Sequence, residues 1–204
     1  ANLTAPHTQA PGLNITDWED TNYPSLNGEF LPLDQSETAR SLAIAPDQQH
    51  FLLGADWSLR YFDQQGDQQW EVAVPGVAWG VNIAGNGQVA VGAFGDGTLR
   101  WYRLRDGQEL LALFPHSDGK RWIVWTPKGY YAASKTAKSL IGWHVNNGPT
   151  QAADFYPAAQ FRSYNRPDVI AKVLETLDIV EAVRLANQER SLSPRFQPSI
   201  DQLL

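Results

Sequence analysis

The sequence predicts an all-β protein: a partial propeller of about three four-stranded antiparallel blades, followed by a C-terminal helical extension. In the stretch 77–114, four apolar runs of strand length are separated by turns rich in glycine, asparagine and aspartate. The chain also repeats itself, since Leu59–Phe62 and Leu99–Tyr102 stand 40 residues apart and Trp143 follows Trp101 by 42. A period of about 40 to 45 residues with four strands per unit is typical of propeller blades.

The central stretch predicts a sheet that is covered on both faces. Asp96-Gly97 separates two of its apolar runs and is a strong hairpin signal. Leu99 and Trp101 point to one face, whereas Tyr102 and Leu104 point to the other. An antiparallel sheet with one solvated face would alternate apolar with polar residues. We therefore expect another layer on each side of this sheet.

The chain divides into three parts. Residues 1–38 predict an extended N-terminal segment with a docking strand over 29–33, which either completes a blade or pairs with an open sheet edge. Residues 39–150 hold the blades, and residues 151–204 form a helical extension and linker tail.

The third blade is the least regular unit of the pattern. Its strands are expected over 121–126, 129–134 and 139–145, with 151–156 as a candidate fourth strand.

A helical period begins after Arg166. Pro167 suits a first helical turn, and apolar residues recur at spacings of three and four up to Leu177. Asp178 and Glu181 form a pair that resembles a capping box. We expect a break there and a second helix over 179–188.

Composition excludes several classes of function. The 204 residues are 43% hydrophobic and carry a net charge of −6 without basic runs, so neither nucleic acid nor an anionic membrane is expected as a partner. No apolar stretch approaches the length of a membrane span. The chain has no cysteine, which excludes disulfides, thiolate catalysis and cysteine-based zinc sites. No cofactor is expected.

Several segments together resemble the last blades of bacterial WD40-repeat proteins that carry a caspase-like protease domain. They are residues 39–47, 54–63, 75–83, 95–114, 118–134 and 140–148, and residues 154–178 resemble the segment that follows those blades. The resemblance runs from about Asn14 to Ala186. It implies an internal piece of a larger bacterial, cytoplasmic protein, in which the propeller recognises or regulates and a separate domain cuts. The catalytic histidine and cysteine of that family belong to the other domain.

Three short motifs resemble catalytic or ligand-binding sequences but favour simpler interpretations. Gly85–Ala90 fits a dinucleotide fingerprint, yet it leads into a strand rather than a helix and reads as a hairpin turn. His116-Ser117-Asp118 holds the residue types of a catalytic triad, but consecutive side chains diverge. The acidic cluster of Asp17, Glu19 and Asp20 lacks the ligand spacing of a calcium loop and indicates a solvated face.

Four residues are weak candidates for partner binding. Arg60 and Arg100 occupy the same register of neighbouring blades, where guanidinium groups either form a binding surface or bond within the blades; we favour the structural role. Trp143 and His144 could line a pocket, although a structural histidine is the favoured interpretation. Six tryptophans could form an aromatic floor for sugars, but packing between blades is favoured; they are Trp57, Trp79, Trp101, Trp122, Trp125 and Trp143.

The function indicated is a non-catalytic protein–protein interaction or regulatory module, and not an enzyme. Its partners would be the remaining blades or the caspase-like domain of the parent protein, or another protein. One alternative is a propeller-type carbohydrate-active hydrolase or lyase that uses acids such as Asp17, Asp96 or Asp118. Another is a structural module that closes by strand exchange or by dimerisation into a homo-oligomer.

Overall fold

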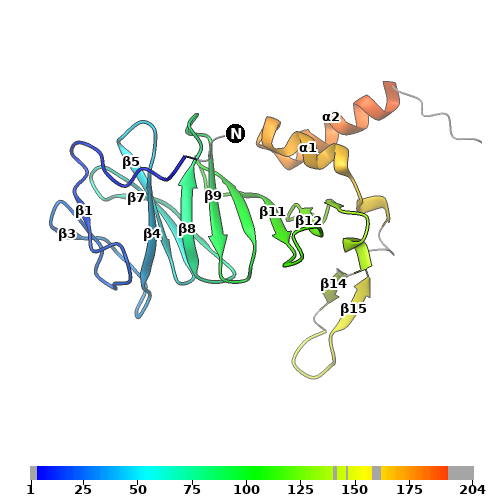
Figure 1. Ribbon diagram of the computed structural model, residues 1–204, viewed down its shortest axis with the longest axis horizontal. Helices are drawn as coiled ribbons and strands as arrows, with labels where there is room; N and C mark the ends of the chain where they lie inside the picture. The colour runs from blue at the N-terminus through cyan, green and yellow to red at the C-terminus, as the bar shows by residue number, and fades with distance from the viewer. Residues whose placement is uncertain (1–3, 140–141, 146, 158–161, 193–204) are drawn as a thin grey trace, which may run out of the picture.

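The computed structural model describes residues 4–139, 142–145, 147–157 and 162–192. Two antiparallel sheets stack face to face, a small N-terminal sheet lies on one side of the stack and two helices lie on the other (Figure 1). No helix within these ranges combines the length and the apolar composition needed to cross a membrane.

The first large sheet is a four-stranded meander in chain order. Its strands are β4 (Ala39–Ile44), β5 (His50–Ala55), β6 (Ser58–Asp63) and β7 (Gln68–Ala73). β4, β5 and β6 are almost continuously buried, whereas β7 forms an exposed outer edge with alternating half-buried residues. This gradient from a buried inner strand to an exposed outer strand is the arrangement of one propeller blade.

The second sheet contains the meander predicted for residues 77–114. Its first strands are β8 (Ala78–Ile83), β9 (Val89–Phe94), β10 (Leu99–Arg103) and β11 (Glu109–Pro115). Residue 97 takes φ +82° in the turn between β9 and β10, a conformation that glycine adopts without strain. Two further strands continue the same sheet, β12 (Trp122–Trp125) and β13 (Tyr131–Ala133).

The interface between the two sheets forms the main core. Leu52 and Tyr61 of the first sheet pack with Val81, Phe94 and Tyr102 of the second. The indole Nε1 of Trp70 on β7 donates a hydrogen bond to the Leu104 carbonyl oxygen, at 2.6 Å, which fastens the outer strand to the neighbouring sheet.

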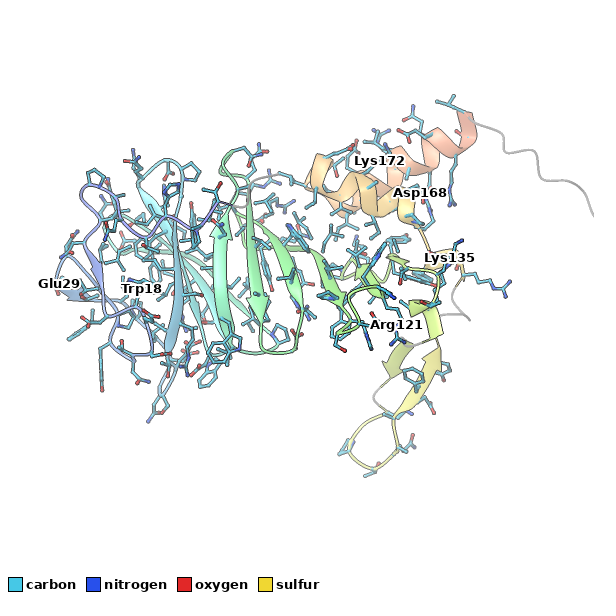
Figure 2. The ribbon with its side chains drawn as sticks, in the orientation of Figure 1. Trp18, Glu29, Arg121, Lys135, Asp168 and Lys172 are labelled. Atoms are coloured by element: carbon cyan, nitrogen blue, oxygen red, sulfur yellow. The ribbon has the colours of Figure 1, made fainter. Side chains whose placement is uncertain are left out.

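The N-terminal segment covers the outer face of the first sheet. Its strands are β1 (Ile15–Thr16), β2 (Ser25–Leu26) and β3 (Glu29–Phe30), which pair only with one another among the described strands. Leu13 and Leu26 join Leu42, Phe51 and Phe62 in one buried cluster. Trp18 packs against the same cluster, between this segment and the first sheet (Figure 2). The predicted docking strand therefore forms a covering layer rather than a strand of a blade.

Two helices cover the opposite face of the second sheet. They are α1 (Pro167–Thr176) and α2 (Ile179–Leu192). Val169, Val173 and Ala182 pack against Leu110 and Leu111 of β11. The layer expected on each face of the central sheet is therefore present, with a sheet on one side and helices on the other.

The break between the helices has the predicted cause. Leu177 ends α1 in the left-handed conformation, and a carboxylate oxygen of Asp178 accepts hydrogen bonds from the backbone N–H groups of Val180 and Glu181.

The strands predicted for a third blade do not form a separate four-stranded unit. β12 pairs with β11 and β13 pairs with β12, because the turn 116–121 folds back as a hairpin instead of passing to a new layer. After a 3₁₀ turn, η1 (Ala137–Ser139), β14 (Gly142–Val145) and β15 (Asp154–Pro157) pair with each other as a separate hairpin. A second 3₁₀ turn, η3 (Arg162–Tyr164), precedes α1. The predicted all-β class with a helical extension is confirmed, and the stack shows the blade arrangement of a partial, WD40-like propeller.

Candidate functional site

Three exposed tryptophans gather at one end of the strands. Trp57 lies in the turn between β5 and β6, and Trp79 and Trp122 lie at the starts of β8 and β12. Their exposed fractions are 44%, 61% and 42%. We call this end of the stack the tryptophan rim; it runs along the lower edge of the sheets in Figure 1. The prediction that these three residues pack between blades is wrong, because all three side chains remain exposed to solvent.

The remaining described tryptophans contribute to packing. Trp101 packs in the cluster beneath the helices, and Trp125 packs with Phe114 and Ile123. Both side chains pack inside the protein, although neither packs between two blades as predicted: Trp101 lies beneath the helices and Trp125 packs within its own sheet. The three rim tryptophans differ from them in being exposed, as are Tyr23, Phe30 and Phe155 elsewhere in the described residues.

Arg60 is buried in an ion-pair network just below the rim. Its side chain is 4% exposed, and its guanidinium group lies 3.0 Å from Glu37 Oε2 and 2.9 Å from Glu71 Oε2. Its Nε donates to Ser58 Oγ, and Ser58 Oγ in turn donates to Glu37 Oε1 at 2.6 Å. A third carboxylate, that of Asp34, lies at 3.3 Å. This geometry gives Arg60 a structural role, because its guanidinium group is held by ion pairs and hydrogen bonds inside the protein.

Arg100 repeats the same pattern in the second sheet. Its Nε donates to Thr98 Oγ1, and its guanidinium group lies 3.0 Å from both Asp96 Oδ2 and Glu109 Oε2. The guanidinium carbon also stands 5.9 Å from the centre of the Trp125 ring. The shared register of Arg60 and Arg100 thus places both in hydrogen-bonded networks that brace the rim from inside.

Arg40 links the N-terminal segment, both sheets and Trp79. It pairs with Asp20 at 2.6 Å and with Asp56 at 2.7 Å, and its guanidinium carbon lies 5.6 Å from the centre of the Trp79 ring. Burial opposes ionisation of Asp56, but hydrogen bonds from Arg40 and Thr38 outweigh it and hold the pKa of this carboxyl below its usual range. Arg40 therefore remains paired with carboxylates at neutral pH.

The structure places the other two candidate residues away from the rim networks. Trp143 and His144 lie on β14, opposite Tyr156 and Phe155 of β15. The side chains of Trp143 and His144 lie outside the described part of the structure.

Two acids of the hydrolase alternative, Asp96 and Asp118, are held ionised, which is the opposite of what a general acid requires. Burial opposes ionisation of Asp96, yet hydrogen bonds from Thr98 and Arg100 hold its pKa below the usual range. Backbone N–H groups of Arg121 and Lys120 lower the pKa of Asp118, and the Arg121 side chain adds to the effect. In the residues that the structure describes, no group of three or more acidic, histidine or cysteine side chains is placed to hold a metal ion.

The short motifs with catalytic likeness are turns, as predicted. Residues 84–88 connect β8 to β9, and Gly87 takes φ +66° there. Residues 116–121 connect β11 to β12, where the His116 N–H donates to the Arg121 carbonyl oxygen.

A cleft of about 390 Å³ lies at the end of the strands opposite the rim. Thr4, His7 and Gln9 of the N-terminal segment form one side, and residues of the β4–β5 and β8–β9 turns, such as Pro46 and Gly85, form the other. Apart from His7, its lining residues carry no ionisable side chain.

Sequence reasoning missed Arg40, Asp56 and Glu37. A signal was present for part of the network: Asp56-x-Ser58-x-Arg60 and Asp96-x-Thr98-x-Arg100 share one spacing, which puts the hydroxyl and the arginine on the same face of the strand. Nothing in the local pattern indicated that Glu37, which precedes β4, would be fully buried.

Comparison with known proteins finds similarity of fold at low sequence identity. No protein-family model matches the sequence, and no curated protein matches it. Among solved structures, "Structure of U3-55K" is similar over 52% of this chain and 38% of its own, with 10% identity and a TM-score of 0.37. "Crystal structure of RRP9 WD40 repeats" is similar over 52% of this chain and 37% of its own, with 12% identity and a TM-score of 0.36. The chain spans less than two fifths of the length of either structure.

Proposed function

We propose that this chain is a non-catalytic protein-interaction module whose contact surface is the tryptophan rim. The observation that carries the proposal is the exposure of Trp57, Trp79 and Trp122 at one end of an otherwise well-covered stack. Strand ends and turns held by a rigid scaffold are where binding residues concentrate. Tryptophan offers a large apolar area with a polar N–H group, and it is enriched at the centres of protein interfaces.

The networks beneath the rim support a role in recognition. Arg60 bonds to Ser58, next to Trp57, and Arg100 bonds to Thr98 and Asp96 in the β9–β10 turn, so these two turns are braced before any partner arrives. A preorganised surface loses less conformational entropy on binding.

For the wider setting, we propose the recognition part of a bacterial, cytoplasmic WD40 and caspase-like protease system. The support is the sequence resemblance between about Asn14 and Ala186. The proposed division is 1–38 as the N-terminal segment, 39–150 as the blades and 151–204 as the helical extension. The mass of the native protein tests this setting, since a mass near that of 204 residues would contradict it.

The rim itself is tested by site-specific photo-crosslinking in cells of the source organism. One variant carries p-benzoylphenylalanine in place of Trp79, and the control carries it in place of Arg105, which is 74% exposed in a turn at the opposite end of the strands. We expect a single adduct of defined mass from position 79 that excess unlabelled chain suppresses. Equal adducts from both positions, or none from position 79, would refute the proposal.

A further inference from the structure

Acidic side chains outnumber the arginines with which they pair around the rim. Three arginines lie in or beside it, and each pairs with at least two carboxylates: Arg40 with Asp20 and Asp56, Arg60 with Asp34, Glu37 and Glu71, and Arg100 with Asp96 and Glu109. Seven carboxylates thus surround three guanidinium groups. The side chains of Asp20 and Asp34 are 70% and 62% exposed, so part of this excess negative charge faces solvent.

Trp79 lies next to the ion-pair network of Arg40. One side of its ring already receives the Arg40 guanidinium group, at 5.6 Å from the ring centre. The residue nevertheless remains 61% exposed, and the two carboxylates paired with that arginine, Asp20 and Asp56, leave the group with a net negative charge. An indole ring next to a net negative charge attracts a further cation through both its π face and the local field.

Trp122 provides a contrast within the same rim. It is exposed to a similar degree as Trp57, but Lys120 and Arg121 precede it in the turn, and Arg121 (labelled in Figure 2) pairs with Asp118. Basic residues therefore outnumber the acidic one in the turn that leads to Trp122, whereas Arg40 beside Trp79 is paired with two carboxylates.

From this distribution we propose that the Trp57–Trp79 part of the rim binds a basic, arginine- or lysine-bearing segment of a partner protein. A guanidinium or ammonium group of the partner stacks on the exposed side of Trp79 and pairs with Asp20, while its aliphatic stem covers apolar area of Trp57 and Trp79. Charge complementarity selects this partner over an acidic one, which the carboxylates would repel. The inference rests on the proposed function and specifies the chemistry of the partner.

The test uses the full chain labelled with ¹⁵N, whose indole N–H signals report on each tryptophan. The probe is a synthetic nonapeptide of glycine and serine with three arginines, and matched peptides carry citrulline or glutamate in place of arginine. We expect a saturable shift of the Trp79 indole signal with the arginine peptide alone. Binding should weaken when salt is raised, because the contact is electrostatic.

Variants separate the rim residues from general stability. Trp79→Ala should weaken binding about tenfold and Asp20→Asn about threefold. Phe155→Ala removes an exposed aromatic side chain from β15, outside the rim, and should leave the affinity unchanged. Circular dichroism confirms that each variant is folded.

Equal binding of the citrulline peptide, or unchanged affinity in Trp79→Ala, would overturn the inference. A crosslinked rim partner that contacts position 79 through a neutral or acidic segment would also overturn it while leaving the proposed function standing. If position 79 gave no specific crosslink in cells but the arginine peptide still bound at Trp79, the proposed function would be refuted. The charge preference of the rim would then still stand.

Discussion

Replacement of Glu37 by alanine is expected to be among the most destabilising single changes in the chain. Glu37 is fully buried and accepts hydrogen bonds from Ser58 Oγ at 2.6 Å and from Arg60 Nη2 at 3.0 Å. Its removal leaves the Arg60 guanidinium, 4% exposed, with carboxylate partners only on its solvent side, Asp34 and Glu71. Removing one partner of a buried ion pair costs about 3–5 kcal/mol, so we expect the free energy of unfolding to fall by that amount.

The matched control is Glu109→Ala in the second sheet. Glu109 also pairs with an arginine, but its side chain is 22% exposed and that of Arg100 is 16% exposed, so solvent screens the loss and we expect about 1 kcal/mol. Urea unfolding followed by tryptophan fluorescence measures both variants, with an unchanged slope as the sign that only stability differs. A Glu37→Ala cost no larger than that of Glu109→Ala would refute the reasoning.

Four further variants test packing, polar burial and charge. Gly107→Ala is expected to cost about 2–3 kcal/mol, because residue 107 has φ +70° and a Cβ there would stand 2.8 Å from Trp70 Cε3. Gly119→Ala, at φ +67° with open space around it, should cost only about 1 kcal/mol in the same urea assay, and equal costs would contradict the packing argument. Tyr102→Phe should leave stability unchanged or raise it by up to about 1 kcal/mol, because the buried Tyr102 hydroxyl has no hydrogen-bond partner in the described ranges; a clear loss of stability would contradict this. A carboxyl with a lowered folded-state pKa stabilises the fold above its ordinary pKa of about 4, and this contribution is lost as the pH falls through the folded-state pKa. The wild type should therefore lose more stability than Asp56→Asn when urea unfolding is compared at pH 6 and at about pH 2, and parallel losses would argue against the Arg40 pairing.

Local patterns predicted the blade because each signal acts over a few residues. Turn glycines such as Gly97 require a positive φ, and the apolar runs between turns have strand length, so the meander from β8 to β11 follows from the sequence alone. The helix break is equally local, since the Asp178 side chain caps the N–H groups only two and three residues ahead. Apolar residues on both faces also indicated the two covering layers.

The fate of β12 and β13 could not be predicted in this way. The connections 74–77 and 116–121 both contain glycine and follow a strand of similar length. The first passes to a new sheet, whereas the second closes a hairpin in which Asp118 accepts backbone hydrogen bonds from Lys120 and Arg121. Which course the chain takes depends on what packs on the next face, and there the helices α1 and α2 occupy the place of a further blade.

The exposure of the rim tryptophans could not be predicted for the same reason, because it also depends on what packs on the neighbouring face. Trp79 and Trp101 both lie in strands of one sheet, but Trp101 is mid-strand under the helices, whereas Trp79 is near the start of β8 and remains 61% exposed. Periodicity assigns a side chain to a face of the sheet, and it does not say how far the neighbouring layer extends over that face.

The covering layers explain why the strand ends are the surface left for recognition. The N-terminal segment buries the outer face of the first sheet, and α1 and α2 bury the outer face of the second, so both faces of the stack are in use. A partner that docked on either face would have to displace a buried apolar cluster, at a cost of roughly 25 cal/mol for each Å² exposed. Binding at the rim displaces nothing and covers tryptophan area that already faces water. The arrangement that stabilises the two sheets therefore also leaves Trp57 and Trp79 exposed, where we propose that partners bind.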